Sequence, residues 1–263
     1  MTTGAITGYI DVAQLTLYAF WIFFAGLLYY LRREDKREGY PLESDRSGSI
    51  RVQGFPGLPA PKTFLVEHGG VRVVPRPPAP MTRNAVPTAG FPGAPLIPTG
   101  NPLADGLGPA AFSDREDVPE TTMDGRPQIV PMRLAPEFML EPRDPDPRGL
   151  NVTDAEGVSV GTVREIWVDR AEPQIRYLEV ELAGPPGRRV LLPMNFTRIR
   201  SGRRGFRSGP GEIQVRALLA PHFAGVPALR NPDQVTRLEE DRITAYYAGG
   251  QLYAKPSRQE PLL

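Results

Sequence analysis

The sequence contains no cysteine and only two histidines among its 263 residues. The missing thiols exclude disulfide bonds, thiolate catalysis, cysteine-ligated zinc and iron–sulfur clusters. The two histidines, His68 and His222, are far apart in the sequence, so a histidine-rich metal site is not expected. An excess of one charge is also missing, because 31 lysines and arginines offset 30 aspartates and glutamates. A net charge of +1 argues against charge-driven binding of nucleic acid, and no nucleic-acid partner is expected.

Motifs for catalysis are also absent. No P-loop motif occurs, and no pairing of a nucleophile with a base stands out in the sequence. We therefore expect a non-catalytic protein, and a membrane-tethered hydrolase is the disfavoured alternative.

Formal charge is missing from residues 12–31, a run of twenty residues that is almost entirely apolar or aromatic. At about 1.5 Å per residue, a helix of this length reaches about 30 Å, the thickness of the hydrocarbon core of a bilayer. The run therefore predicts a transmembrane helix over 12–31. A cleaved signal peptide is disfavoured because its positive charge would precede the apolar run. A buried core helix is the remaining alternative.

The charges around this run predict its orientation. The first 31 residues contain no lysine or arginine, and a cluster of basic residues follows at once: Arg32, Arg33, Lys36 and Arg37. The positive-inside rule then predicts that residues 1–11 are periplasmic and that the chain after the helix is cytoplasmic.

Proline is concentrated in the middle of the chain, where residues 41–147 hold 21 of the 31 prolines. Long helices and central strands are not expected there, since proline lacks a backbone donor and restricts the residue before it. We expect an irregular cytoplasmic segment over 32–148, with one short hairpin formed by residues 64–66 and 71–74. Disorder is one interpretation of the segment. The other is an extended ribbon on a partner's surface, which must offset roughly 1–2 kcal/mol of ordering entropy per residue.

The composition changes near Gly149, where apolar residues begin to alternate with polar ones. Short strands with turn signals between them predict a small antiparallel barrel or sandwich over 149–250. The expected strands are 158–169, 174–182, 188–193, 197–200 and 212–215. A short helix near Leu238 is expected, capped by Asp233 or Thr236, and the chain is expected to be irregular from Gly249, with a tail over 251–263. The predicted fold class is thus one N-terminal transmembrane helix followed by a mainly-β cytoplasmic domain.

Carboxylates are the remaining candidates for chemistry. Asp169 and Glu172 flank one tight turn, and Glu120 and Asp124 precede the predicted barrel. Such groups can relay protons where burial or a neighbouring charge brings their pKa nearer to the working pH. A solvated acidic loop is the alternative, and composition alone favours it.

Segments in order along the whole chain carry a resemblance to a known family. They include residues 18–31, 37–43, 61–64, 166–169, 176–181, 222–227 and 247–250. In these segments the chain resembles the H subunit of the purple bacterial photosynthetic reaction centre. The resemblance implies a single transmembrane helix and a cytoplasmic β-barrel of the PRC type. It also implies that this subunit binds no cofactor itself, and that bacteriochlorophyll, bacteriopheophytin, quinones and non-haem iron belong to partner subunits.

The resemblance further implies a function. The subunit is expected in the bacterial inner membrane, where it stabilises the L and M subunits, shields the quinone sites and assists proton transfer to the secondary quinone. A cytochrome subunit and a light-harvesting antenna ring are further candidate partners. The alternative is a membrane-anchored β-barrel scaffold that docks another membrane complex.

Residue roles follow from the same resemblance. Glu172 matches the family's glutamate near the secondary quinone, Asp169 is the second candidate, and Arg176 matches an arginine expected beside them. Some members use a pair of histidines before Ile129 to take up protons. This chain has none there, so the uptake role would pass to Glu120 and Asp124.

A lipid site is implied at the end of the transmembrane helix. Tyr30, Arg32 and Arg33 stand where the family contacts an anionic lipid such as cardiolipin, and their charge suits a headgroup at the cytoplasmic interface.

Overall fold

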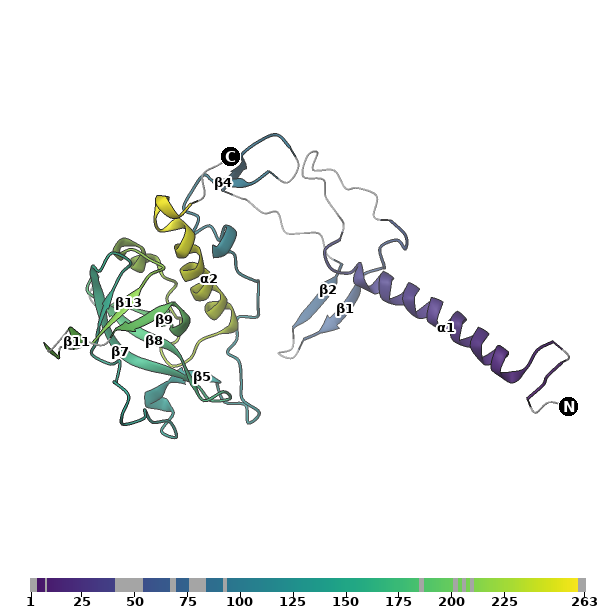
Figure 1. The fold of residues 1–263 in the computed structure, drawn as a ribbon, viewed down its shortest axis with the longest axis horizontal. Helices are drawn as coiled ribbons and strands as arrows, with labels where there is room; N and C mark the ends of the chain where they lie inside the picture. Colours follow the sequence, from purple (N-terminus) through teal and green to yellow (C-terminus); the bar gives the residue numbers. More distant parts are fainter. Residues whose placement is uncertain are drawn as a thin grey trace. The chain divides into compact units, whose positions relative to one another are not determined.

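The computed structural model describes residues 4–7, 9–40, 54–66, 70–75, 84–91, 94–184, 187–200, 203–204, 207–208 and 211–259. The chain divides into two compact units (Figure 1). The first comprises Met1–Thr82 with Pro87–Pro95, and the second comprises Arg83–Val86 with Leu96–Leu263. His68, in the turn of the expected hairpin, lies outside the described residues.

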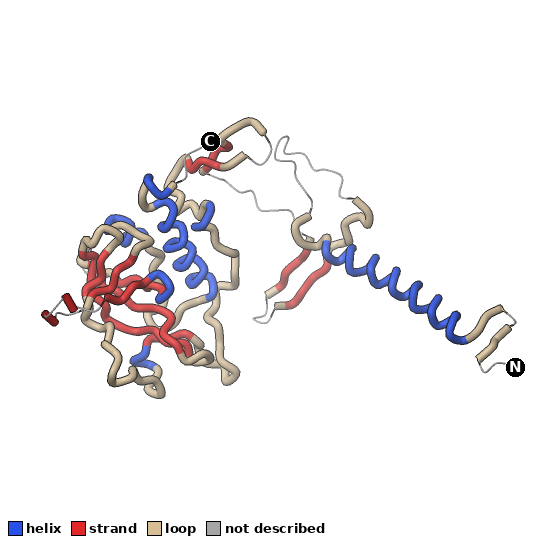
Figure 2. Tube along the Cα trace, in the orientation of Figure 1, coloured by secondary structure: helices blue, strands red, loops and turns tan. Residues whose placement is uncertain are grey.

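The first unit is dominated by helix α1, Val12–Asp35 (Figure 2). Its N-terminus is capped by Asp11, whose side chain accepts a hydrogen bond from the Gln14 backbone N–H at 2.7 Å. None of its residues is buried, and the helix is long and apolar enough to cross a membrane. A helix that is apolar all round needs an apolar environment to cover it. It begins at the predicted residue and continues past Leu31, so that Arg32 and Arg33 form part of its last turn.

A small hairpin follows in the same unit. Strands β1, Lys62–Leu65, and β2, Val71–Val74, pair antiparallel with Phe64 opposite Arg72. This confirms the hairpin predicted from the sequence. Strands β3, Ala85–Pro87, and β4, Leu96–Pro98, form another two-stranded sheet.

The second unit is built on a curled seven-stranded sheet (Figure 1). The strands pair in the order β10-β13-β6-β7-β8-β9, and β5 also pairs with β7. Their bounds are β5 Ile129–Pro131, β6 Asn151–Thr153, β7 Ser159–Asp169, β8 Gln174–Leu182, β9 Arg189–Pro193, β10 Thr197–Arg200 and β13 Glu212–Val215. A separate two-stranded sheet consists of β11 Arg203–Arg204 and β12 Arg207–Ser208. The five strands predicted from the sequence are confirmed to within one residue at each end.

Short 3₁₀ turns connect these elements. They are η1 Gly108–Ala110, η2 Met132–Leu134, η3 Met194–Phe196, η4 Ala220–Gly225 and η5 Pro256–Arg258.

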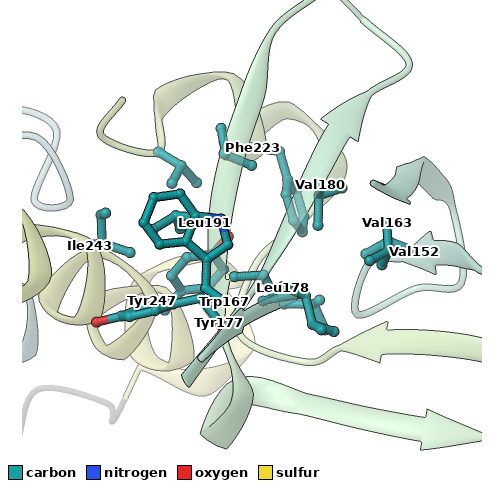
Figure 3. Close-up of a cluster of buried hydrophobic side chains, with 14 of the residues drawn as sticks. Val152, Val163, Trp167, Tyr177, Leu178, Val180, Leu191, Phe223, Ile243 and Tyr247 are labelled. Carbon is teal, nitrogen blue, oxygen red and sulfur yellow. The ribbon is translucent and has the colours of Figure 1, made fainter. Parts of the chain in front are cut away.

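The hydrophobic core lies between the sheet and helix α2, Arg237–Tyr253 (Figure 3). The strands contribute Trp167 and Leu178, both fully buried, and the helix contributes Ile243 and Tyr247. Burying one side chain of this size stabilises the fold by about 1.5–3 kcal/mol. Thr236 caps the helix, because its hydroxyl accepts from the Glu239 N–H at 3.2 Å and the Glu239 carboxylate accepts from the Thr236 N–H at 2.9 Å.

Helix α2 is longer than the sequence suggested. The chain was expected to be irregular from Gly249, but the helix continues through Gly249 and Gly250 to Tyr253. The reason is close packing: a Cβ on Gly250 would lie 2.3 Å from the Leu218 Cδ2 atom, and a Cβ on Gly249 would lie 2.5 Å from the Ala110 Cβ atom. Both glycines therefore allow neighbouring segments to pack closely against the helix, and they do not end it.

The sheet also includes a strand from the proline-rich middle. All three residues of β5 are buried, and Ile129 pairs with Asp169 at the end of β7. The structure thus differs from the expected boundary at 149, since the second compact unit already includes the chain from Leu96 onward. A three-residue strand that ends in proline is too short to show an alternating pattern, so it was not predicted from the sequence.

Candidate functional site

The acidic turn between β7 and β8 is held by a buried carboxylate. Asp169 is the last residue of β7 and only 2% exposed. Its Oδ1 atom accepts hydrogen bonds from the backbone N–H groups of Ala171 at 2.9 Å and Glu172 at 3.1 Å. This is the arrangement by which aspartate stabilises a turn that follows it. The backbone position of Glu172 is therefore fixed by Asp169.

A second residue holds the same carboxylate from the neighbouring strand. Pairing of Ile129 with Asp169 places Gln128 beside the turn. The Gln128 Nε2 atom lies 3.0 Å from Oδ1 and 3.1 Å from Oδ2 of Asp169, and the Gln128 carbonyl accepts from the Arg170 N–H at 2.9 Å. Sequence reasoning missed Gln128, because a glutamine has no motif of its own and its partner is 41 residues away.

Glu172 is the exposed member of the acidic turn. Its Oε2 atom accepts a hydrogen bond from the Gln174 side-chain amide at 3.0 Å. The structure thus brings Asp169 and Glu172 together, as the sequence predicted, but gives them opposite surroundings. Asp169 is buried among N–H donors, whereas the Glu172 carboxylate is open to water.

The loop that carries Glu120 and Asp124 is a narrow, well-bonded hairpin. Thr121 bridges Pro127, and the Gln128 N–H donates to the Glu120 carbonyl at 2.8 Å. The loop therefore ends at the residue that contacts Asp169.

Within this loop, Asp124 accepts hydrogen bonds from the Thr122 hydroxyl and the Arg126 guanidinium, both at 2.6 Å. These bonds, the one from Thr122 foremost, lower the pKa of Asp124 below its ordinary value. A carboxylate with a lowered pKa holds a proton for less of the time near pH 7, so these bonds make Asp124 a weaker proton carrier.

Arg176 lies elsewhere than expected. Its Nη2 atom is 3.7 Å from Oε2 of Glu240 on α2, and within the described part of the chain it forms no ion pair with Asp169 or Glu172. The pairing of β7 with β8 explains this, because the register shifts between Tyr177 and Ile175 and leaves Arg176 at an irregularity that redirects its side chain.

Glu240 is a titratable residue that sequence reasoning did not single out. It accepts a hydrogen bond from the Tyr177 hydroxyl at 2.9 Å, and burial raises the pKa of its carboxyl. Glu120 adds to this shift by its negative charge, and it also lies 3.6 Å from Arg237 at the start of α2. The Glu120 side chain thus interacts with charged residues of α2, whereas Asp124 is bonded within the loop.

The predicted lipid-binding residues lie at the end of α1. Tyr30 and Arg32 are exposed and Arg33 is half-buried. The Lys62 Nζ atom lies 5.8 Å from the centre of the Tyr30 ring and 2.6 Å from Oε2 of Glu34. The helix end therefore combines an aromatic ring with a group of cations, the chemistry that suits an anionic headgroup at a membrane interface.

Metal chemistry finds little support in the part of the chain that the structure describes. No group of three or more metal-binding side chains occurs among those residues. His222 is used locally, where its Nδ1 atom accepts from the Leu219 N–H at 3.2 Å, and burial lowers its pKa.

Comparison with known families identifies the class and then the family. An apolar helix of membrane-spanning length joined to a curled sheet defines a membrane-anchored β-barrel protein, and residues 139–214 match the PRC-barrel domain. Residues 4–134 match the family described as photosynthetic reaction centre, H-chain N-terminal region. The chain belongs to this H-chain family of the photosynthetic reaction centre. It is accordingly a structural subunit that associates with other reaction-centre subunits.

Proposed function

We propose that this subunit covers the L and M subunits on the cytoplasmic side, stabilises them, shields their quinone sites and assists proton transfer to the secondary quinone. The observation that carries the proton-transfer role is the exposed carboxylate of Glu172 on a turn that Asp169 holds in place. The pigments, quinones and non-haem iron belong to the partner subunits in this proposal, and this chain binds none of them directly.

The chemistry requires a proton supply from the water side. Reduction of the secondary quinone to quinol consumes two electrons and two protons, and the protons must reach a site that is shielded from bulk water. A carboxylate that faces water and has a fixed backbone can take up a proton and release it inward. Glu172 meets both conditions, and Asp169 lies at the same turn. Glu120 and Asp124 on the neighbouring loop are the proposed uptake groups, and the hydrogen bonds that lower its pKa make Asp124 a weak one.

The test is the substitution Glu172→Gln in the assembled reaction centre. We expect proton-coupled transfer of the second electron to slow by about a hundredfold or more, the typical cost of losing a positioned proton-transfer group. Primary charge separation should be unchanged, since it involves no proton. Flash-induced absorbance changes measure both steps.

The matched control is Glu141→Gln, which removes the same charge from another exposed glutamate. It should leave both steps unchanged. An unaltered second electron transfer in Glu172→Gln would remove Glu172 from the mechanism.

Further parts of the proposal concern the membrane. The absence of basic residues before Arg32 supports a periplasmic N-terminus and a cytoplasmic location for the rest of the chain. Tyr30, Arg32 and Arg33 would bind an anionic lipid such as cardiolipin, a role that the cation-rich end of α1 supports. A cytochrome subunit and an antenna ring are further proposed neighbours, and the bacterial inner membrane is the proposed location.

A further inference from the structure

We propose that Gln128 and Asp169 act together as positioning residues for Glu172, and that Asp169 does not itself carry protons. This inference rests on the proton-transfer role proposed for Glu172. It assigns Gln128 a part in that role, and it gives the two acids of the turn different tasks.

Amide groups surround the Asp169 carboxylate. Its partners are the side-chain amide of Gln128 and the backbone N–H groups of Ala171 and Glu172. Amide N–H groups orient a carboxylate but do not release their protons near neutral pH. A proton carrier needs contact with water or with a group that exchanges protons. Within the described residues Asp169 has only amide partners, and it is 2% exposed, so its surroundings suit a structural anchor.

Gln128 is held by hydrogen bonds of its backbone. Its N–H donates to the Glu120 carbonyl at 2.8 Å, its carbonyl accepts from the Arg170 N–H at 2.9 Å, and the next residue begins β5. Because these bonds hold the backbone of Gln128, only the rotamers of its side chain remain to be ordered when the amide binds Asp169. Gln128 therefore connects the loop of Glu120 to the acidic turn through fixed contacts.

Glu172 is held at its backbone by the anchor Asp169. Its N–H donates to Asp169, and the one hydrogen bond of its side chain among the described residues comes from Gln174. A fixed backbone limits the positions that the carboxylate reaches, and a misplacement of about 1 Å can cost up to about a hundredfold in rate. The anchor thus matters for transfer even though it handles no proton.

Two substitutions of Asp169 separate positioning from proton carriage in the assembled reaction centre. Asp169→Asn keeps an oxygen that accepts from Ala171 and Glu172, and rotation of the Gln128 amide lets its Oε1 atom accept from the new amide. Asp169→Ala removes both contacts. We expect the rate of second electron transfer to stay within about twofold of wild type in Asp169→Asn and to fall by about tenfold in Asp169→Ala. The pH profile of Asp169→Asn should keep its wild-type shape.

Gln128→Met tests the second positioning residue. Methionine keeps the length of the side chain but has no N–H to donate, so the Asp169 carboxylate loses its side-chain donor. We expect second electron transfer to become several-fold slower. The control is Gln251→Met on the exposed face of α2, which should leave the rate unchanged.

Amide hydrogen exchange of the peptide that contains Ala171 and Glu172 provides a measurement independent of proton transfer. Protection should be kept in Asp169→Asn and lost in Asp169→Ala. The inference is overturned if Asp169→Asn is as slow as Asp169→Ala, or if protection in Asp169→Ala equals that of wild type. If Glu172→Gln has no effect, the proposed function fails, and the exchange data still decide whether Asp169 holds the turn.

Discussion

Glu240 is a buried acid that connects helix α2 to strand β8 of the barrel unit. Its carboxylate on α2 meets Tyr177 of β8, which is 3% exposed, and Arg176 of the same strand. Burial raises the pKa of Glu240, and the charges of Arg176 and Arg115 oppose that shift while the charge of Glu120 adds to it. Burial also raises the pKa of Tyr177. In both groups the protonated form is therefore more favoured in the folded protein than in the unfolded chain.

This shift predicts a pH dependence of stability. In the unfolded chain Glu240 titrates near its ordinary pKa of about 4.3, but in the folded chain it titrates at higher pH. The contribution of Glu240 to the stability of the folded state is therefore complete below about pH 4.3. It is lost as the pH rises toward the folded-state pKa, because the unfolded state releases its proton first. Glu240→Gln should remove this loss, so as the pH rises above about 4.3 its free energy of unfolding should fall less than that of wild type.

Urea unfolding of the full chain in detergent at several pH values measures this dependence. A Trp21→Phe background leaves Trp167, which lies in the core, as the only fluorescent tryptophan. Glu141→Gln is the control and should follow wild type. Equal pH slopes for Glu240→Gln and wild type would contradict the prediction.

Residue-scale contacts of this kind could be predicted only in part. The turn acids Asp169 and Glu172 were found because they are close in sequence. Tyr177 and Glu240 are 63 residues apart, and no local pattern connects them. The partner of Arg176 was missed for the same reason, since Glu240 is about as distant from it in the sequence.

At the scale of elements, helix α2 depends on two glycines for its contacts. Gly250 packs against Leu218 and Ala217, and a Cβ there would lie 2.7 Å from the Ala217 carbonyl oxygen. Backbone atoms cannot yield as a flexible side chain can, so the helix would have to move.

Gly250→Ala should therefore be destabilising. In an exposed helix this change stabilises by up to about 1 kcal/mol, but here overpacking is expected to cost about 1–3 kcal/mol. The same fluorescence-monitored unfolding measures it, and Gln251→Ala on the exposed face is the control. A variant as stable as wild type would show that the helix shifts at no cost.

The elements differ in how well the sequence predicts them. Strands β7 and β8 were predicted because alternation and β-branched residues persist over 11 and 9 residues. The end of α2 was predicted wrongly, because a Gly-Gly pair is typical of a helix end and only the packing of Ala110 and Leu218 shows its other use. Strand β5 was missed because three residues are too few to show an alternation of apolar and polar side chains.

At the scale of the whole molecule, the chain combines an exposed apolar helix with a barrel unit that has its own core. The proposed topology places the two ends of α1 on opposite sides of the membrane. The chain offers a direct test, because it contains no cysteine and a single introduced thiol is unique within it.

Thr7→Cys and Glu141→Cys should report opposite sides. In spheroplasts a membrane-impermeant maleimide should label the chain that carries Thr7→Cys and leave the chain that carries Glu141→Cys unlabelled. After permeabilisation both should react, which controls for reactivity. Labelling of Glu141→Cys in intact spheroplasts would reverse the proposed orientation.

The pairing of β5 with β7 has a consequence for anyone who wishes to cut the barrel out of the longer polypeptide. A fragment starting at Gly149 would lack strand β5, which pairs with Trp167, Val168 and Asp169. The unpaired edge of β7 would then be prone to aggregation. The fragment would also lack the amide that steadies Asp169. The smallest autonomous piece must therefore begin upstream of Glu120, well before the point where the sequence first looks like a barrel.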